Sequence, residues 1–121
     1  MLIALWIINV ILAIAFIASG VMKLVRSKQA LVASGMGWAD DFGVGTIKLI
    51  AVLEILGAVG LVFPMLLNIV PILAPLAAAA LAIVMIGATV VHVRRHEPPI
   101  PAVVLAVLSI ASAVIGFIVL A

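Results

Sequence analysis

Apolar residues fill most of the chain, and only short polar stretches interrupt them. A membrane-spanning helix needs about 20 consecutive, mostly apolar residues, and residues 2–22 meet this requirement. Residues 55–91 also lack charge, but this run is too long for one helix. Pro64 and Pro71 interrupt it, because the residue before a proline disfavours helical backbone. The pattern predicts four spans, at about 2–22, 46–65, 72–93 and 100–120.

Prolines agree with these boundaries. Pro75 falls in the first turn of the third span, where a missing N–H costs little. Pro98, Pro99 and Pro101 precede or open the fourth span. We therefore expect an all-α fold, an antiparallel four-transmembrane-helix bundle that forms a single membrane domain over residues 1–121.

All six Lys and Arg residues lie in the first and third connections or at the borders of these connections. They are Lys23, Arg26, Lys28, Lys48, Arg94 and Arg95. Because cytoplasmic loops carry an excess of cations, connections 23–45 and 94–99 are predicted to be cytoplasmic and both termini extracytoplasmic. The net charge of +2 is far too small for a nucleic-acid surface.

Composition narrows the class of protein further. The chain is 69% hydrophobic and 8% charged, which excludes a water-soluble domain. The absence of cysteine from the sequence excludes disulfides, thiol redox chemistry and thiolate metal sites. The first apolar run lacks a basic start and is longer than that of a signal peptide, so it is predicted to be a retained transmembrane helix.

The first connection is partly apolar. Residues 30–33 and Trp38 lie between cations and the acidic pair Asp40-Asp41. Two interpretations remain open. One is a short interfacial helix followed by a glycine-rich turn, with Trp38 at the level of the lipid headgroups. The other is an ordinary loop anchored by one tryptophan.

Small residues predict which face of each span points inward, because helices in lipid associate through close contact. The predicted stripes are Asn9, Ala13, Phe16, Gly20 and Lys23 in the first span, Glu54, Gly57, Ala58 and Leu61 in the second, Ala77 to Ala80, Met85, Ala88 and His92 in the third, and Ala102, Ala106, Ser109, Ala113 and Gly116 in the fourth. Asn9 and Ser109 are expected to form interhelical hydrogen bonds.

Glu54 is the only acidic residue within the predicted spans. A carboxylate in hydrocarbon is costly unless it is protonated or paired, so it is expected to face the bundle interior. Lys23 and His92 end their spans at the cytoplasmic level, about two turns from Glu54, and are its predicted partners. Lys48 lies on a different face of the same helix as Glu54 and is a secondary candidate.

This polar cluster has two interpretations. It could be structural, because buried ion pairs can satisfy one another and fix the register of helices. Alternatively, Glu54 and His92 could exchange protons with a quinone or lipid headgroup bound near the cytoplasmic leaflet. His92 and His96 have the spacing of a metal-binding pair, but His96 follows two arginines beyond the predicted helix end, so no metal site is predicted. The sequence identifies no cofactor.

Four segments together resemble the DoxX-like family of small four-helix bacterial membrane proteins. They are ASGVMKL at 18–24, ASGMGW at 33–38, KLIAVLEILGAVGLVFP at 48–64 and LAPLAAAALAIVMIGATVVHVRRHE at 73–97. The resemblance implies a place in the bacterial inner membrane, and Lys23, Glu54 and His92 match recurrent polar positions of the family. Relatives include the small subunit of an archaeal thiosulfate:quinone oxidoreductase and membrane partners of envelope oxidoreductases.

Three functions follow from these observations. The first is a non-catalytic membrane subunit or scaffold with an internal polar site, which supports a redox or envelope-maintenance partner, because the chain has almost no mass outside the membrane. Self-association or assembly into a membrane complex is expected. The second is a quinone-linked oxidoreductase subunit with Glu54 and His92 as a proton relay. The third is a small transporter, which the pattern does not favour because no internal repeat or broken span is visible.

Overall fold

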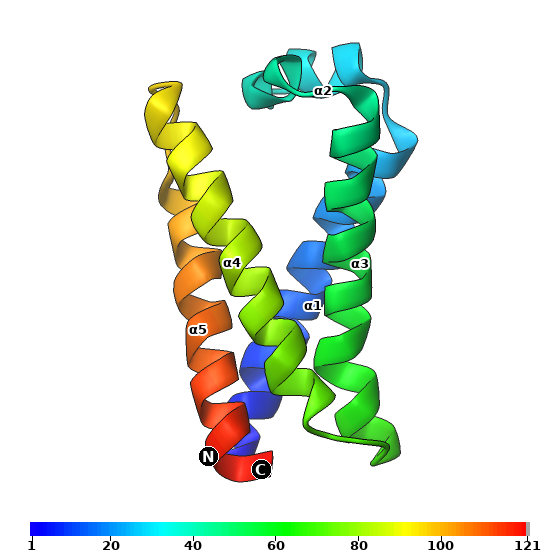
Figure 1. Ribbon diagram of the computed structural model, residues 1–121, viewed down its shortest axis with the longest axis vertical. Helices are drawn as coiled ribbons and strands as arrows, with labels where there is room; N and C mark the ends of the chain where they lie inside the picture. The colour runs from blue at the N-terminus through cyan, green and yellow to red at the C-terminus, as the bar shows by residue number, and fades with distance from the viewer. Residues whose placement is uncertain (121) are drawn as a thin grey trace.

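The computed structural model describes residues 1–120, which form a bundle of helices joined by short connections (Figure 1). Its elements are α1 (Leu2–Val25), α2 (Lys28–Ala33), the 3-10 helix η1 (Gly37–Asp41), α3 (Val44–Leu67), α4 (Leu73–Arg94) and α5 (Ile100–Leu120). The four helices of more than 20 residues are long and apolar enough to cross a membrane. The predicted all-α bundle of four transmembrane helices is confirmed.

The long helices form two pairs. α1 packs mainly against α3, and α4 packs mainly against α5, while α3 also contacts α4 and α1 contacts α5. The pairs approach one another at the end that holds both termini and diverge toward the other end (Figure 1). The first and third connections, which carry the cations, both lie at this open end.

Small residues allow the helices to approach closely. A methyl group on Gly20 of α1 would lie 2.9 Å from the carbonyl oxygen of Ala51 in α3. One on Gly116 of α5 would lie 2.9 Å from Cβ of Pro75 in α4. Both distances are shorter than ordinary van der Waals contact, so a larger residue would push the helices apart. In lipid, this close contact between helices replaces the hydrophobic effect as a source of stability.

The predicted inward stripes of the first and fourth spans are confirmed, since all of their residues are buried. In α3, Glu54, Ala58 and Leu61 are buried, and Gly57 packs against Leu81 of α4. The stripe predicted for the third span is partly wrong, because Ala80 is exposed. The buried residues of α4 are Ala74, Pro75, Ala78, Leu81, Ala82 and Met85. Four consecutive alanines cover every face of a helix, so their positions could not indicate which face turns inward.

The first connection contains a short helix, as the first of its two interpretations predicted. Ser27 caps α2 by accepting a hydrogen bond from the backbone N–H of Ala30, at 3.1 Å. α1 extends to Val25, three residues beyond the predicted span. Lys48 Nζ donates to the carbonyl oxygen of Leu24 at 3.3 Å, and so satisfies one of the carbonyls that a helix leaves unpaired at its end.

Asn9 joins three helices near the end that holds the termini. Its Nδ2 donates to the carbonyl oxygen of Leu61 in α3 at 2.9 Å, and its Oδ1 accepts a hydrogen bond from Ser112 of α5. The interhelical role predicted for Asn9 is therefore confirmed. The same prediction is wrong for Ser109, because its buried hydroxyl finds no partner among residues 1–120. Ser112, one turn further along α5, takes that role.

Replacement of Asn9 with alanine should lower the free energy of unfolding by about 1 kcal/mol, a typical value for a hydrogen bond between membrane helices. The variants Asn9→Ala and Ser112→Ala should be non-additive in a double-mutant cycle, because they share one interaction. Unfolding in mixed micelles of SDS measures both effects. Ser109→Ala is the matched control and should be nearly neutral; a loss equal to that of Ser112→Ala would contradict the assignment.

Candidate functional site

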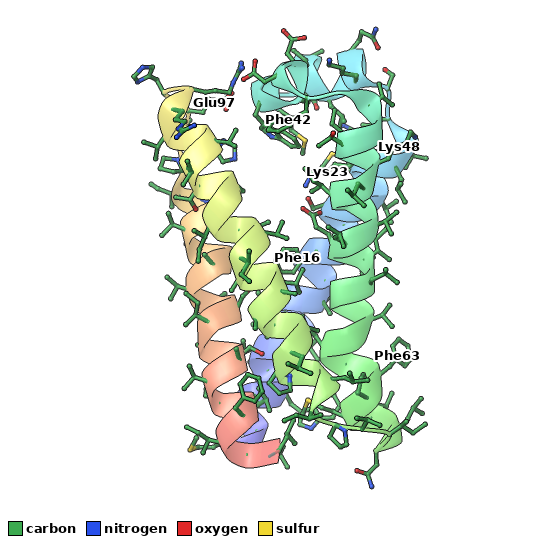
Figure 2. The ribbon with its side chains drawn as sticks, in the orientation of Figure 1. Phe16, Lys23, Phe42, Lys48, Phe63 and Glu97 are labelled. Atoms are coloured by element: carbon green, nitrogen blue, oxygen red, sulfur yellow. The ribbon has the colours of Figure 1, made fainter. Side chains whose placement is uncertain are left out.

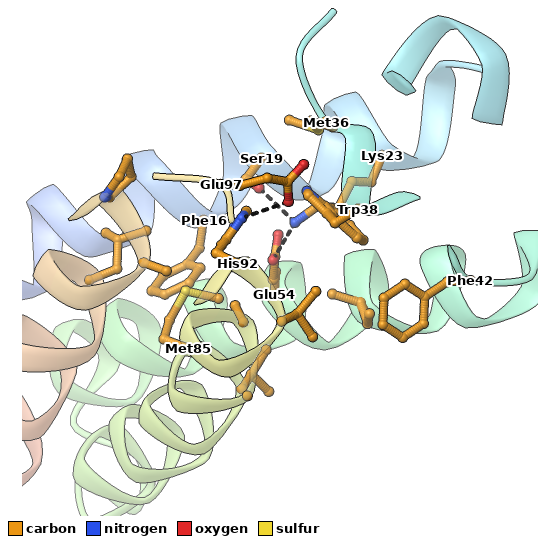
Figure 3. Close-up of a pocket in the computed structure, with 18 of the residues that line it drawn as sticks. Phe16, Ser19, Lys23, Met36, Trp38, Phe42, Glu54, Met85, His92 and Glu97 are labelled. Carbon is orange, nitrogen blue, oxygen red and sulfur yellow. Dashed lines mark hydrogen bonds and ion pairs between the residues drawn. The ribbon is translucent and has the colours of Figure 1, made fainter. Parts of the chain in front are cut away.

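A cavity of about 700 Å³ lies between the two helix pairs at the open end of the bundle. Residues of α1, η1, α3, α4 and α5 line it, and most of them are apolar. Phe16, Met36, Trp38, Phe42 and Met85 provide its larger side chains (Figure 3). Such a volume and such a lining are typical of a site for a small molecule.

Lys23 and Glu54 form a buried ion pair in the wall of this cavity. Lys23 Nζ lies 2.6 Å from Oε1 of Glu54, and the two side chains are only 8% and 1% exposed. The cation comes from the last turns of α1 and the carboxylate from the middle of α3, so the pair joins the two helices. Sequence reasoning predicted this contact. Lys48 points away from the interior, as its position on a different helix face required (Figure 2).

Two further groups surround the Lys23 ammonium. Nζ donates a hydrogen bond to Oγ of Ser19 at 2.9 Å. It also lies 5.4 Å from the centre of the Trp38 ring, within the range of a cation–π interaction. The structure places Trp38 against this charge in the cavity wall, a contact that the sequence did not predict (Figure 3).

Glu54 is only partly satisfied. Its Oε1 accepts the hydrogen bond from Lys23, whereas its buried Oε2 has no hydrogen-bond partner in the described part of the chain, residues 1–120. An unpaired charged oxygen in a low-dielectric site is costly, and a functional explanation is often the right one for such a group.

His92 lines the same cavity but is not bonded to Glu54. Its Nδ1 lies 3.3 Å from Oε1 of Glu97, in the connection between α4 and α5. The predicted partnership of His92 with Glu54 is therefore wrong. Toward this end α4 diverges from α3 (Figure 1), and the His92 ring pairs with Glu97 instead (Figure 3).

The end of α4 explains how Glu97 reaches His92. The backbone N–H of Glu97 donates to the carbonyl of His92 at 2.9 Å, and that of His96 donates to Val93 at 3.2 Å. These two bonds form a Schellman motif, in which His96 adopts the left-handed conformation with φ of 58°. His96 is exposed beyond the helix end and does not share a face with His92, so the spacing of the two histidines does not form a metal-binding pair.

Arg95 connects the two sides of the open end. Its guanidinium forms an ion pair with Asp41 of η1, and its Nε lies 3.4 Å from Oε1 of Glu97. The hydrogen bond to Asp41 raises the pKa of the Arg95 guanidinium above its usual value, and it therefore stays charged. This contact holds the segment that carries Trp38 against the α4–α5 connection.

Ser19, Trp38 and Glu97 are the polar or amphipathic cavity residues that sequence reasoning did not assign to the site. Ser19 lies one turn before Lys23 on α1, and that spacing could have indicated it. By contrast, Asn9 and Ser109 are absent from the cavity lining and belong to the packed part of the bundle.

Comparison with known families settles where the chain belongs. A model of the DoxX-like family matches residues 7–115, which include every residue of the cavity wall. The chain belongs to the DoxX-like family. Searches of curated proteins and of solved structures found no match. With four helices able to span the bilayer, this DoxX-like protein is an integral membrane protein.

The Asp41→Asn variant tests the contact between η1 and Arg95. Hydrogen exchange at residues 37–42 should become faster, because the neutral side chain no longer pairs with Arg95. Thermal stability should change little, since exposed ion pairs contribute little to global stability. Hydrogen–deuterium exchange measured by mass spectrometry gives the first quantity. Asp40→Asn is the matched control, and an equal acceleration in that variant would show a general effect of charge instead.

Proposed function

We propose that this DoxX-like protein is a membrane subunit that binds a lipid-soluble small molecule in the cavity between its helix pairs. In this proposal it supports a redox or envelope-maintenance partner and is not catalytic by itself. The observation that carries the proposal is the unpartnered, buried Oε2 of Glu54 in the wall of an otherwise mostly apolar cavity.

The cost of this carboxylate argues for a ligand. A purely structural ion pair would be most stable with both oxygens satisfied, because an unpaired buried acceptor loses its hydration without compensation. The terminal torsion of a glutamate side chain is broad, so Oε2 can turn toward the adjoining cavity. A polar headgroup that enters the cavity would then supply the missing partner.

The cavity wall also includes residues on the outer surface of the bundle. Ile83 of α4 is 72% exposed, and Gly87 and Pro101 are exposed as well. In a four-helix membrane protein, such residues face the lipid. The apolar part of a ligand could therefore extend toward the bilayer while its headgroup stays near Glu54. This supports a lipid-soluble molecule rather than a water-soluble metabolite.

We further propose an orientation and a partner class. The protein would lie in the inner membrane of a bacterium, with the cationic connections in the cytoplasm and both termini outside. The distribution of charge along the sequence supports this orientation. Apart from α2, η1 and the short connections, the chain has little that could contact a soluble protein. Partners would therefore bind through the exposed apolar faces of the helices, as further copies of this chain or as other membrane subunits.

A second candidate function is a proton relay in a quinone-linked complex. It is favoured by one observation, that the cavity is lined by two titratable pairs, Lys23–Glu54 and His92–Glu97. Oxidation of a quinol to a quinone releases two electrons and two protons. In this hypothesis the partner subunit accepts the electrons, and Glu54 and His92 accept the protons.

The Glu54→Gln variant distinguishes a binding role from a structural one. We expect lower stability, by about 3 kcal/mol, because the buried Lys23 ammonium loses its counter-charge. We also expect the variant to lose small molecules that co-purify with the wild type in native lipids, as measured by mass spectrometry at matched protein amounts. Lys48→Gln is the control, because Lys48 lies outside the cavity. Identical co-purifying molecules in Glu54→Gln and wild type would contradict the proposal. In the relay hypothesis, the variant would instead accumulate normally and abolish quinol-dependent turnover of the partner.

Reporter fusions test the orientation. Alkaline phosphatase fused after residue 121 should be active and green fluorescent protein at the same position dark, since folding of each reporter depends on the compartment. Fusions within residues 94–99 should give the reverse pattern. A fluorescent fusion after residue 121 would show that the proposed orientation is inverted.

A further inference from the structure

Three neighbouring groups already surround the Lys23 ammonium. A lysine side chain carries three N–H donors. The groups that surround Nζ are Oε1 of Glu54 at 2.6 Å, Oγ of Ser19 at 2.9 Å and the face of the Trp38 ring at 5.4 Å. Two of the three donors are hydrogen-bonded to these oxygens, the indole ring covers the ammonium at cation–π distance, and the carboxylate balances the charge.

The other charged groups at the cavity are also paired. His92 and Glu97 contact one another, and the Arg95 guanidinium contacts Asp41 and Glu97. Among residues 1–120, the basic side chains that line the cavity, Lys23 and His92, therefore each already face a carboxylate. Among the described residues that line the cavity, the buried polar atom without a hydrogen-bond partner is an acceptor, Oε2 of Glu54; Arg95 Nε and Ser109 Oγ also lack hydrogen-bond partners but lie outside the lining.

We propose that the cavity selects headgroups that donate a hydrogen bond, such as a hydroxyl or an amine, and rejects anionic headgroups. This inference rests on the proposed binding function and names the class of ligand. A hydroxyl can donate to Oε2 of Glu54, whereas a carboxylate, phosphate or sulfur oxyanion would face that oxygen with like charge. The Lys23 charge would offset little of this repulsion, because Glu54 already balances it. The chemistry of the ligand is thus set by the neighbours of Lys23 as much as by Glu54.

Ser19 and Trp38 gain a specific role in this inference. They are positioning residues that occupy Lys23, and so prevent it from acting as an anion-binding group. Removal of the Ser19 hydroxyl frees one N–H of Lys23 toward the cavity while the ion pair remains. Replacement of Glu54 with glutamine has a larger effect, because it leaves the ammonium without a counter-charge.

The test uses two brominated probes that differ only in headgroup, 2-bromododecan-1-ol and 2-bromododecanoate. Bromine quenches tryptophan fluorescence at short range. Trp38 lines the cavity and Trp6 does not, so a Trp6→Phe background makes Trp38 the only reporter. The full chain is placed in zwitterionic nanodiscs at pH 8. Each probe concentration is corrected for partition into protein-free nanodiscs.

We expect saturable quenching by the alcohol at about tenfold lower concentration than by the carboxylate, the size of one charge-assisted hydrogen bond. Ser19→Ala should reduce the tenfold preference for the alcohol, because it strengthens binding of the carboxylate. Glu54→Gln should reverse the preference, so that the carboxylate binds more tightly than the alcohol. Equal or tighter binding of the carboxylate to the wild type would overturn the inference but leave the binding function standing. An unchanged preference for the alcohol in Ser19→Ala would also overturn the inference. No saturable quenching by either probe would overturn both the inference and the proposed function.

Discussion

The contact between Lys23 and Glu54 imposes the strictest geometric requirement in this protein. Two charges within a membrane must meet, because neither is tolerated alone in a low-dielectric environment. Their contact therefore fixes the register of α1 against α3, and Gly20 and Ala51 allow these antiparallel helices to pack closely at this level. The ion pair and the small-residue contact depend on each other, because a shift along either helix would break both.

The two ends of the bundle differ in how their polar groups are used. Near the termini, Asn9 is hydrogen-bonded to α3 and α5, and the helices leave little space. At the other end the helix pairs separate, and the polar groups form local pairs across or beside a cavity. Polar residues thus join helices at one end and line a cavity between the helix pairs at the other.

Most of the bundle could be predicted from the sequence, because lipid leaves few alternatives. Backbone groups within the bilayer must be satisfied by helices, and isolated charges must find partners, so hydropathy and the position of Glu54 were informative. The contacts around the cavity were harder to predict from the sequence. The bond between His92 and Glu97 requires His96 to adopt a left-handed backbone, and that conformation is uncommon for residues other than glycine. The place of Trp38 depends on how the whole first connection folds, and no local pattern encodes it.

The close packing of the helix pairs at one end has a mechanical consequence. Any rotation of one pair relative to the other must pivot near Asn9, where the hydrogen bonds between α1, α3 and α5 concentrate. From Asn9 to its end at Val25, α1 extends about 24 Å, at 1.5 Å per residue. Displacement grows with distance from a pivot, so a small change in the gap beside Glu54 becomes a larger one at α2, η1 and Arg95. Small rotations near Asn9 would therefore produce their largest displacements at the two cationic connections.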